Sequence, residues 1–164
     1  MRAIAAGLLL LAAAAAVASC GESMIDAARA ERVIRGAVAG QLQSRVASVT
    51  CPENVGKKEG GRFTCVVTGA DGSKGAAAVT QRENGGFSVN APFLNVRDAE
   101  RVMAEQIGRR IERDDVRVAC PEIVVDRPGQ RFTCRATSGA RSADFSVRLT
   151  DGAGQFRYRP PKLR

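Results

Sequence analysis

A cysteine-closed loop that occurs twice restricts the fold of this chain more than any other feature. The segment CPENVGKKEGGRFTC begins at Cys51 and returns sixty-nine residues later as CPEIVVDRPGQRFTC, which begins at Cys120. The flanking residues match at the same offset, AERVI with AERVM and Phe87 with Phe156. Because the match runs without a gap over more than fifty residues, it predicts duplication of a whole unit, in tandem or around a pseudo-twofold axis.

Each copy begins with helical periodicity and continues with apolar residues at every second position. Helices are expected at 27–45 and 96–113, preceded by the capping residues Asp26 and Asn95. Phe63, Cys65 and Val67 then alternate as strand residues do. The predicted fold is α+β, with two tandem repeats, each of one helix packed on a small antiparallel sheet of about four strands, and each with an internal disulfide.

The two faces of the expected helices have different roles. We expect one apolar stripe in each helix to face the sheet. The stripes are Ala30, Val33, Ile34, Ala37, Val38 and Leu42 in the first helix, and Ala99, Val102, Met103, Ile107 and Ile111 in the second. On the outer faces, Glu31 with Arg35 and Glu105 with Arg109 have the i,i+4 spacing of solvated ion pairs.

The cysteines favour a disulfide framework. Apart from Cys20, the chain has Cys51, Cys65, Cys120 and Cys134, which permit three connectivities. The duplication favours Cys51 with Cys65 and Cys120 with Cys134, since each repeat then closes its own loop. Zinc sites use closer cysteine spacing, often with histidine, which is absent here, and redox pairs use C-x-x-C. We therefore expect no metal and no cofactor.

The amino-terminal segment has the pattern of an export signal. Arg2 is followed by an apolar run from Ala3 to Ala18 and by small residues. An uncleaved membrane helix is the alternative, but the run is shorter than the roughly 20 residues that a bilayer core needs. Val17-Ala18-Ser19-Cys20 resembles the lipobox of bacterial lipoproteins, which implies acylation of Cys20, for example with palmitate. The protein is then exported and lipid-anchored to the cell membrane or outer membrane, facing the periplasm or the exterior.

These features predict the organisation of the chain. We expect a lipoprotein signal peptide at 1–19, a lipidated linker at 20–25, repeat 1 at 26–91, repeat 2 at 92–160 and a basic tail at 161–164.

The cysteine motif resembles a known family. The motif consists of Val49-Thr50-Cys51-Pro52 with Gly60 to Cys65 in the first copy, and of the equivalent residues from Val118 to Cys134 in the second. It resembles an uncharacterised two-cysteine domain of bacterial, mainly actinobacterial, lipoproteins, here in two tandem copies. The family has no known function, so the resemblance implies no catalytic residue. The duplicated layout is also similar, as a fold, to beta-lactamase inhibitor protein and to small outer-membrane assembly lipoproteins.

Positive charge gathers in the second copy. Residues 116–164 contain ten basic and four acidic side chains. By strand alternation, the outward face of the second sheet is expected to display Arg131, Arg135, Arg148, Arg157 and Arg159. This face is either a solvated surface or a docking surface for an anionic envelope component. Nucleic acid is not an expected partner, because the chain is exported and only 4% aromatic.

The chain offers little for enzymatic chemistry. It has no histidine and no G-x-S-x-G or phosphate-loop motif, and Asp114-Asp115 is interpreted as a helix-end turn. We therefore expect no enzyme, but a membrane-anchored, non-catalytic binding or interaction module. The alternative is an accessory that inhibits or helps assemble another envelope protein, and a purely structural role is also open.

Overall fold

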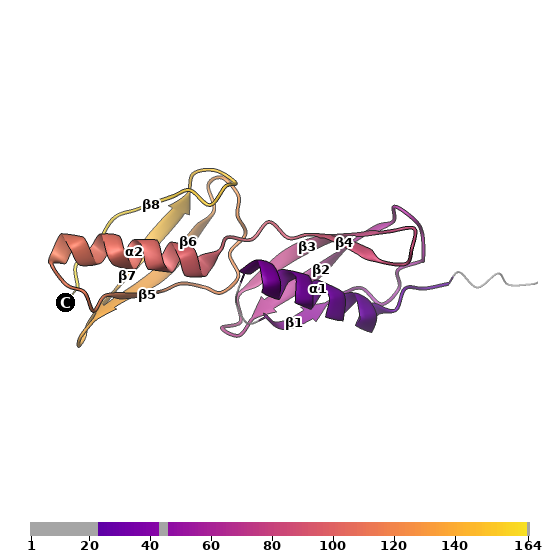
Figure 1. Ribbon diagram of the computed structural model, residues 1–164, viewed down its shortest axis with the longest axis horizontal. Helices are drawn as coiled ribbons and strands as arrows, with labels where there is room; N and C mark the ends of the chain where they lie inside the picture. Colours follow the sequence, from indigo (N-terminus) through magenta and orange to yellow (C-terminus); the bar gives the residue numbers. More distant parts are fainter. Residues whose placement is uncertain (1–22, 43–45, 164) are drawn as a thin grey trace, which may run out of the picture.

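The computed structural model describes residues 23–42 and 46–163, which form two units joined end to end (Figure 1). The first unit consists of α1 (Ala27–Leu42), β1 (Val46–Thr50), β2 (Arg62–Gly69), β3 (Lys74–Gln81) and β4 (Phe87–Asn90). The second consists of α2 (Val96–Ile111), β5 (Arg117–Ala119), β6 (Arg131–Ser138), β7 (Arg141–Leu149) and β8 (Phe156–Tyr158). Both sheets are antiparallel with neighbouring strands in chain order, so the predicted α+β repeat is confirmed.

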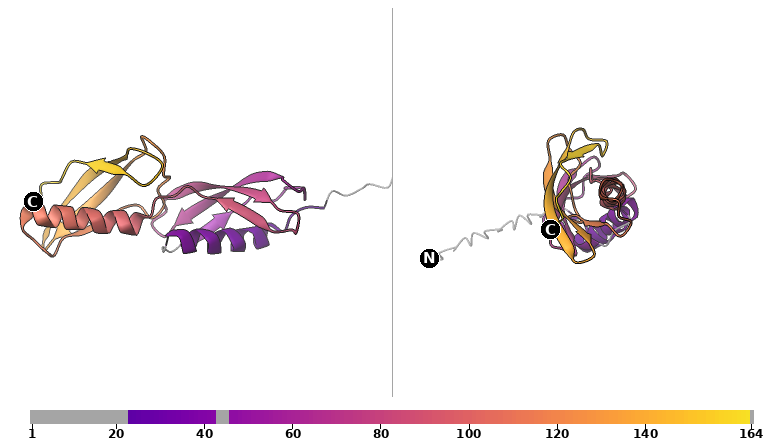
Figure 2. Two further views of the ribbon diagram at one scale, coloured as in Figure 1. Left: turned by 45° about the horizontal axis from the view of Figure 1, so that its top comes forward. Right: turned by 90° about the vertical axis from the view of Figure 1, so that its left-hand side faces the viewer.

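In each unit the helix covers one face of the sheet (Figure 2). The predicted stripes supply most of the buried helix residues, among them Ile34 and Val38 in α1 and Met103 and Ile107 in α2. The stripes are narrower than predicted, because Val33 is 42% exposed and Ile111 is 37% exposed. No helix of residues 23–42 and 46–163 covers the opposite face of either sheet, where alternate side chains are exposed.

The predicted caps begin both helices. The Asp26 carboxylate accepts a hydrogen bond from the Arg29 amide at 2.9 Å, and the Asn95 side-chain oxygen accepts one from the Asp98 amide at 3.4 Å. The second helix ends at Ile111, two residues before the predicted end, because Glu112 takes a left-handed conformation and the chain turns back. A Cβ atom at position 108 would lie 2.5 Å from the Arg113 carbonyl oxygen, so this turn requires Gly108. The predicted end of the first helix, at 43–45, lies outside the described residues.

Each unit has its own disulfide and its own core. Cys51 is bonded to Cys65 and Cys120 to Cys134, which confirms the predicted internal disulfides. Cys65 and Cys134 are fully buried between sheet and helix. Each disulfide therefore joins the start of the cysteine loop to the central strand that follows it, and its second cysteine is part of the hydrophobic core.

The two copies do not align without a gap, contrary to the prediction. Thr68 pairs with Lys74 across the first hairpin, whereas its counterpart Thr137 pairs with Ser142, so the second unit has one residue fewer here. The next turn of the second unit is one residue longer than its counterpart, which restores the offset. Six residues separate the paired Leu149 and Phe156, whereas five separate the paired Gln81 and Phe87 of the first unit. The two changes cancel, which hides them from a sequence comparison. In register, Thr80 therefore corresponds to Arg148.

A short extended segment leads into each helix and pairs with that unit's own cysteine loop. In the first unit, the Ile25 amide donates to the Val55 carbonyl at 2.9 Å. In the second, the Leu94 amide donates to the Val124 carbonyl, also at 2.9 Å. The linker between the units is therefore hydrogen-bonded to the second unit through Leu94, while its Phe93 packs in the core of the first unit.

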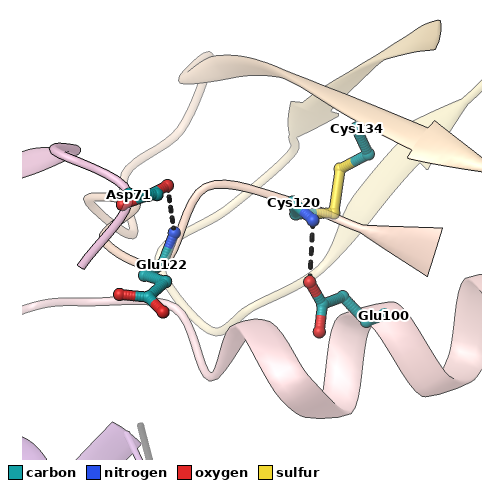
Figure 3. Close-up of a disulfide and its surroundings, with 5 residues drawn as sticks. All are labelled: Asp71, Glu100, Cys120, Glu122 and Cys134. Carbon is teal, nitrogen blue, oxygen red and sulfur yellow. Dashed lines mark hydrogen bonds between the residues drawn. A yellow bond between two sulfur atoms is a disulfide. The ribbon is translucent and has the colours of Figure 1, made fainter. Parts of the chain in front are cut away.

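The cysteine loop of the second unit also contacts the first unit. The Glu122 amide donates to the Asp71 carboxylate at 3.0 Å (Figure 3). The Ile123 amide donates to the Ser73 hydroxyl at 2.9 Å. The Ile123 side chain is only 4% exposed and belongs to the core of the first unit. This junction couples two units that the sequence predicted only as separate repeats.

Candidate binding surface

Three arginines form a line across the exposed face of the second sheet. Arg131 on β6 is directly opposite Arg148 on β7, and Arg148 is directly opposite Arg157 on β8. All three side chains are exposed, on the face away from α2, because the residues beside them in each strand point into the core. We call these three residues the arginine row.

The arginine row is a concentration of charge that folding alone does not favour. Like charges directly opposite each other on neighbouring strands destabilise a sheet. Among residues 23–42 and 46–163, the ion pairs involve other arginines, namely Arg101, Arg113 and Arg135. The positive charge of the row is thus not neutralised by an acidic neighbour in the described part of the chain.

Arg135 lies on the same face but differs from the row in its charge balance. Its guanidinium group donates two hydrogen bonds to the carboxylate of Asp144, its direct cross-strand neighbour, at 2.7 and 3.0 Å. This bonding lowers the pKa of Asp144 and keeps it ionised. The basic face predicted from alternation is therefore locally neutral at Arg135 and remains basic along the row.

The rest of this face is polar. Between the arginine row and the Arg135–Asp144 pair, Thr133 lies opposite Ser146. Arg159 is exposed just beyond β8, two residues after Arg157, and extends the positive charge. In the predicted tail, Leu163 packs against the second core.

The equivalent row of the first unit contains one arginine instead of three. There Arg62 lies opposite Thr80, and Thr80 lies opposite Ser88. The two units have the same backbone register at these positions, so the difference lies in the side chains alone. The first unit is thus an internal reference for the arginine row.

Two glutamates form structural hydrogen bonds that were not predicted from the sequence. Glu100 on α2 accepts a hydrogen bond from the Cys120 amide at 2.7 Å (Figure 3), and Glu31 on α1 accepts one from the Cys51 amide at 3.0 Å. The interpretation of Glu31 as half of a solvated ion pair with Arg35 is therefore wrong. The signal was present in the repeated AER segment, where both glutamates share the offset of the cysteines.

Replacing Glu100 with alanine should lower the free energy of unfolding of the second unit by about 1–2 kcal/mol, because the Cys120 amide loses its acceptor. Replacing the exposed Glu105 should change it by less than about 0.5 kcal/mol. The chain has one tyrosine and no tryptophan, and Tyr158 packs against the second core, so its fluorescence reports this unit during denaturation. Equal effects of the two substitutions would contradict the role of Glu100.

The charge of Glu100 adds a pH dependence to this comparison. Burial raises the pKa of Glu100, and the negative charge of Glu122 raises it further. The hydrogen bond from the Cys120 amide and the charge of Arg97 lower the pKa, but the net shift is upward. The folded protein thus holds a proton on Glu100 more tightly than the unfolded chain does. As the pH rises through and above the ordinary pKa of 4.5, the wild type should lose stability relative to Glu100→Gln. A stability difference that does not change with pH would contradict this sign.

Asp115 is a further acidic residue with structural partners. Asp115 accepts hydrogen bonds from Arg113 at 3.1 Å and from the Ser138 hydroxyl at 2.6 Å, and the bond from Arg113 is the main reason that the pKa of Asp115 is lowered. These bonds tie the end of α2 to the β6–β7 turn, where Asp114-Asp115 was interpreted as a turn. Within the described ranges, no group of three or more acidic or cysteine side chains is placed to hold a metal ion.

The fold and its disulfides indicate a class of protein. Disulfides persist in oxidising compartments, so the two bonds suggest an extracytoplasmic protein. The predicted lipidation site, Cys20, lies outside the described residues. No helix within the described ranges is long and apolar enough to cross a membrane.

A protein-family model matches part of the chain. Residues 9–86 match a family model described as "Domain of unknown function (DUF4333)", and this range contains the first cysteine loop. The chain is thus similar to an uncharacterised family over its first copy, as the cysteine motif predicted, while the second unit lies outside the match. No curated protein and no solved structure matches the chain.

Proposed function

We propose that this protein is a membrane-anchored lipoprotein of the bacterial envelope, and that it acts as a non-catalytic binding module through the basic sheet face of its second unit. The arginine row carries the proposal. It places three positive charges side by side at a cost to the sheet, while the same row of the first unit contains Arg62, Thr80 and Ser88. An anionic envelope component would neutralise this charge.

The anchor is proposed from the amino-terminal sequence. Val17-Ala18-Ser19-Cys20 ends an apolar segment and lies only a few residues before α1. Each buried methylene of an acyl chain contributes about 0.8 kcal/mol, so two or more chains on Cys20 give stable attachment. The structured units then face the periplasm or the exterior, where the disulfides persist.

The non-catalytic role rests on how the polar side chains are used. The chain has no histidine. The Glu100 carboxylate accepts a hydrogen bond from a main-chain amide. The Asp115 carboxylate accepts hydrogen bonds from an arginine and a hydroxyl group, and the Asp144 carboxylate accepts them from an arginine. These groups hold the fold together, so they are poorly placed to act as free acids or bases.

The proposal is tested with a soluble chain from Gly21 to Arg164, which retains both cores because every core residue lies between Ile25 and Leu163. This chain should bind isolated cell envelopes at low salt and be released at high salt. Replacing Arg131, Arg135, Arg148, Arg157 and Arg159 with glutamine should abolish this association, measured by co-sedimentation.

A charge-matched control distinguishes an effect of the sheet face from an effect of the net charge of the protein. Five exposed arginines of the helices, Arg29, Arg32, Arg35, Arg109 and Arg110, are replaced with glutamine. This variant should still associate with envelopes. Unchanged association of the sheet-face variant would remove the proposal, and a single protein partner that resists high salt would support the accessory role instead.

A further inference from the structure

We propose that the arginine row binds the phosphate groups of a linear phosphodiester polymer of the envelope. This inference rests on the proposed function and identifies the ligand of the same surface. Arginine suits phosphate because its planar guanidinium group donates paired hydrogen bonds to two oxygens of one phosphate. Such pairs need exposed, uncompensated guanidinium groups, and the row provides them in Arg131, Arg148 and Arg157.

The spacing of the row favours a ligand with several charges. Neighbouring strands lie about 4.7–4.9 Å apart, so the row extends over roughly 10 Å of backbone from Arg131 to Arg157. A single phosphate can contact only part of that length. A chain with negative charges at regular intervals can run across the strands and contact all three arginines together.

The surroundings of the row also fit a chain. A shallow depression borders it, lined by Pro128, Gly129, Arg148, Leu149, Thr150 and Arg157. On its other side, the hydroxyl groups of Thr133 and Ser146 can donate to the same ligand. The depression and the hydroxyl groups therefore flank the arginine row on its two sides.

A bilayer fits this face less well. A flat anionic surface that covers the whole sheet would also meet Asp144. Among the described residues, the large apolar side chains that are exposed are Met24, Val33, Val66 and Ile111, and none of them lies on the β6–β8 face. Proteins that rest on membranes usually insert apolar side chains between the headgroups, so this face lacks the second contribution that membrane binding needs.

The first unit supplies the substitutions for the test. Arg148→Thr and Arg157→Ser give the second unit the residues that the first unit carries in register, Thr80 and Ser88. These residues are already accommodated in the same backbone, so the variant should fold. Arg29→Gln with Arg32→Gln on α1 is the control that removes the same charge elsewhere.

Binding of the soluble chain is measured by titration calorimetry with three probes: synthetic poly(glycerol phosphate), inorganic phosphate, and vesicles of phosphatidylglycerol in phosphatidylcholine. We expect the polymer to bind best. The Arg148→Thr/Arg157→Ser variant should bind it at least about tenfold more weakly, with a salt dependence reduced by about one unit of slope per arginine removed. The Arg29→Gln/Arg32→Gln control should bind the polymer like the wild type.

The other outcomes overturn the inference in distinguishable ways. Stronger binding to the vesicles, lost in the same variant, would assign the row to a membrane surface. Equal weakening by the control would show that only net charge matters. Absence of polymer binding while the row still mediates salt-sensitive envelope association would leave the proposed function standing with another ligand, and loss of both would remove both proposals.

Discussion

Removing the Cys51–Cys65 disulfide is expected to lower the free energy of unfolding of the first unit by about 3 kcal/mol. The bond closes a loop with a sequence separation of 14 residues, which restricts the unfolded chain. A unit of this size buries little surface, so such a loss is a large part of its stability. Alanine is the suitable replacement, because Cys65 is fully buried and a serine would bury a hydroxyl group.

The single tyrosine makes this prediction specific to one unit. Far-ultraviolet circular dichroism reports both units, whereas Tyr158 fluorescence reports only the second. The Cys51→Ala/Cys65→Ala variant should show an early unfolding transition by dichroism, while the Tyr158 signal changes at higher denaturant. The matched Cys120→Ala/Cys134→Ala variant should shift the Tyr158 signal. An unchanged dichroism midpoint in the first variant would contradict the predicted stabilising role of the Cys51–Cys65 disulfide.

Replacing Ile123 with asparagine is expected to destabilise the first unit by about 2–4 kcal/mol, although Ile123 lies in the sequence of the second. Its side chain is buried in the first core against Phe93 and Gly75. Asparagine is the residue that the first copy carries at the equivalent position, Asn54. The substitution therefore keeps the loop sequence natural while it removes the contact between the units.

Gly75→Ala tests the same contact from the other side. A Cβ atom at this position would lie 2.8 Å from the Ile123 side chain and closer still to the Phe93 ring, and such overpacking costs about 1–3 kcal/mol. The exposed Asn54 is the control, and its replacement by alanine should have an effect within about 0.5 kcal/mol. If Ile123→Asn shifted only the Tyr158 transition, the junction would not stabilise the first unit.

Much of the fold could be predicted because local patterns specify it. The caps at Asp26 and Asn95 precede apolar stripes of helical period, and strand alternation assigned the exposed side of Arg131, Arg148 and Arg157. The lipid anchor at Cys20 stays a prediction from sequence.

Register was harder to predict, because it depends on the length of each turn. The first hairpin of the second unit is one residue shorter and the next turn one residue longer, so the repeat showed no gap. Only the actual pairing shows that Arg135 lies opposite Asp144 and that three arginines share one line. A change of one residue in either turn would separate these groups, because cross-strand contacts depend on direct opposition.

The sequence by itself determined the repeated unit, its helix and strands, its internal disulfide and the side of the sheet on which the arginines lie. These properties follow from spacing within one copy, where neighbours in the chain are also neighbours in space. The tertiary structure alone decided which charges are paired, that Glu31 and Glu100 hold the cysteine loops, and that Ile123 completes the core of the other unit. Such contacts join residues that are far apart in the chain, so they depend on how complete elements pack and not on any local pattern.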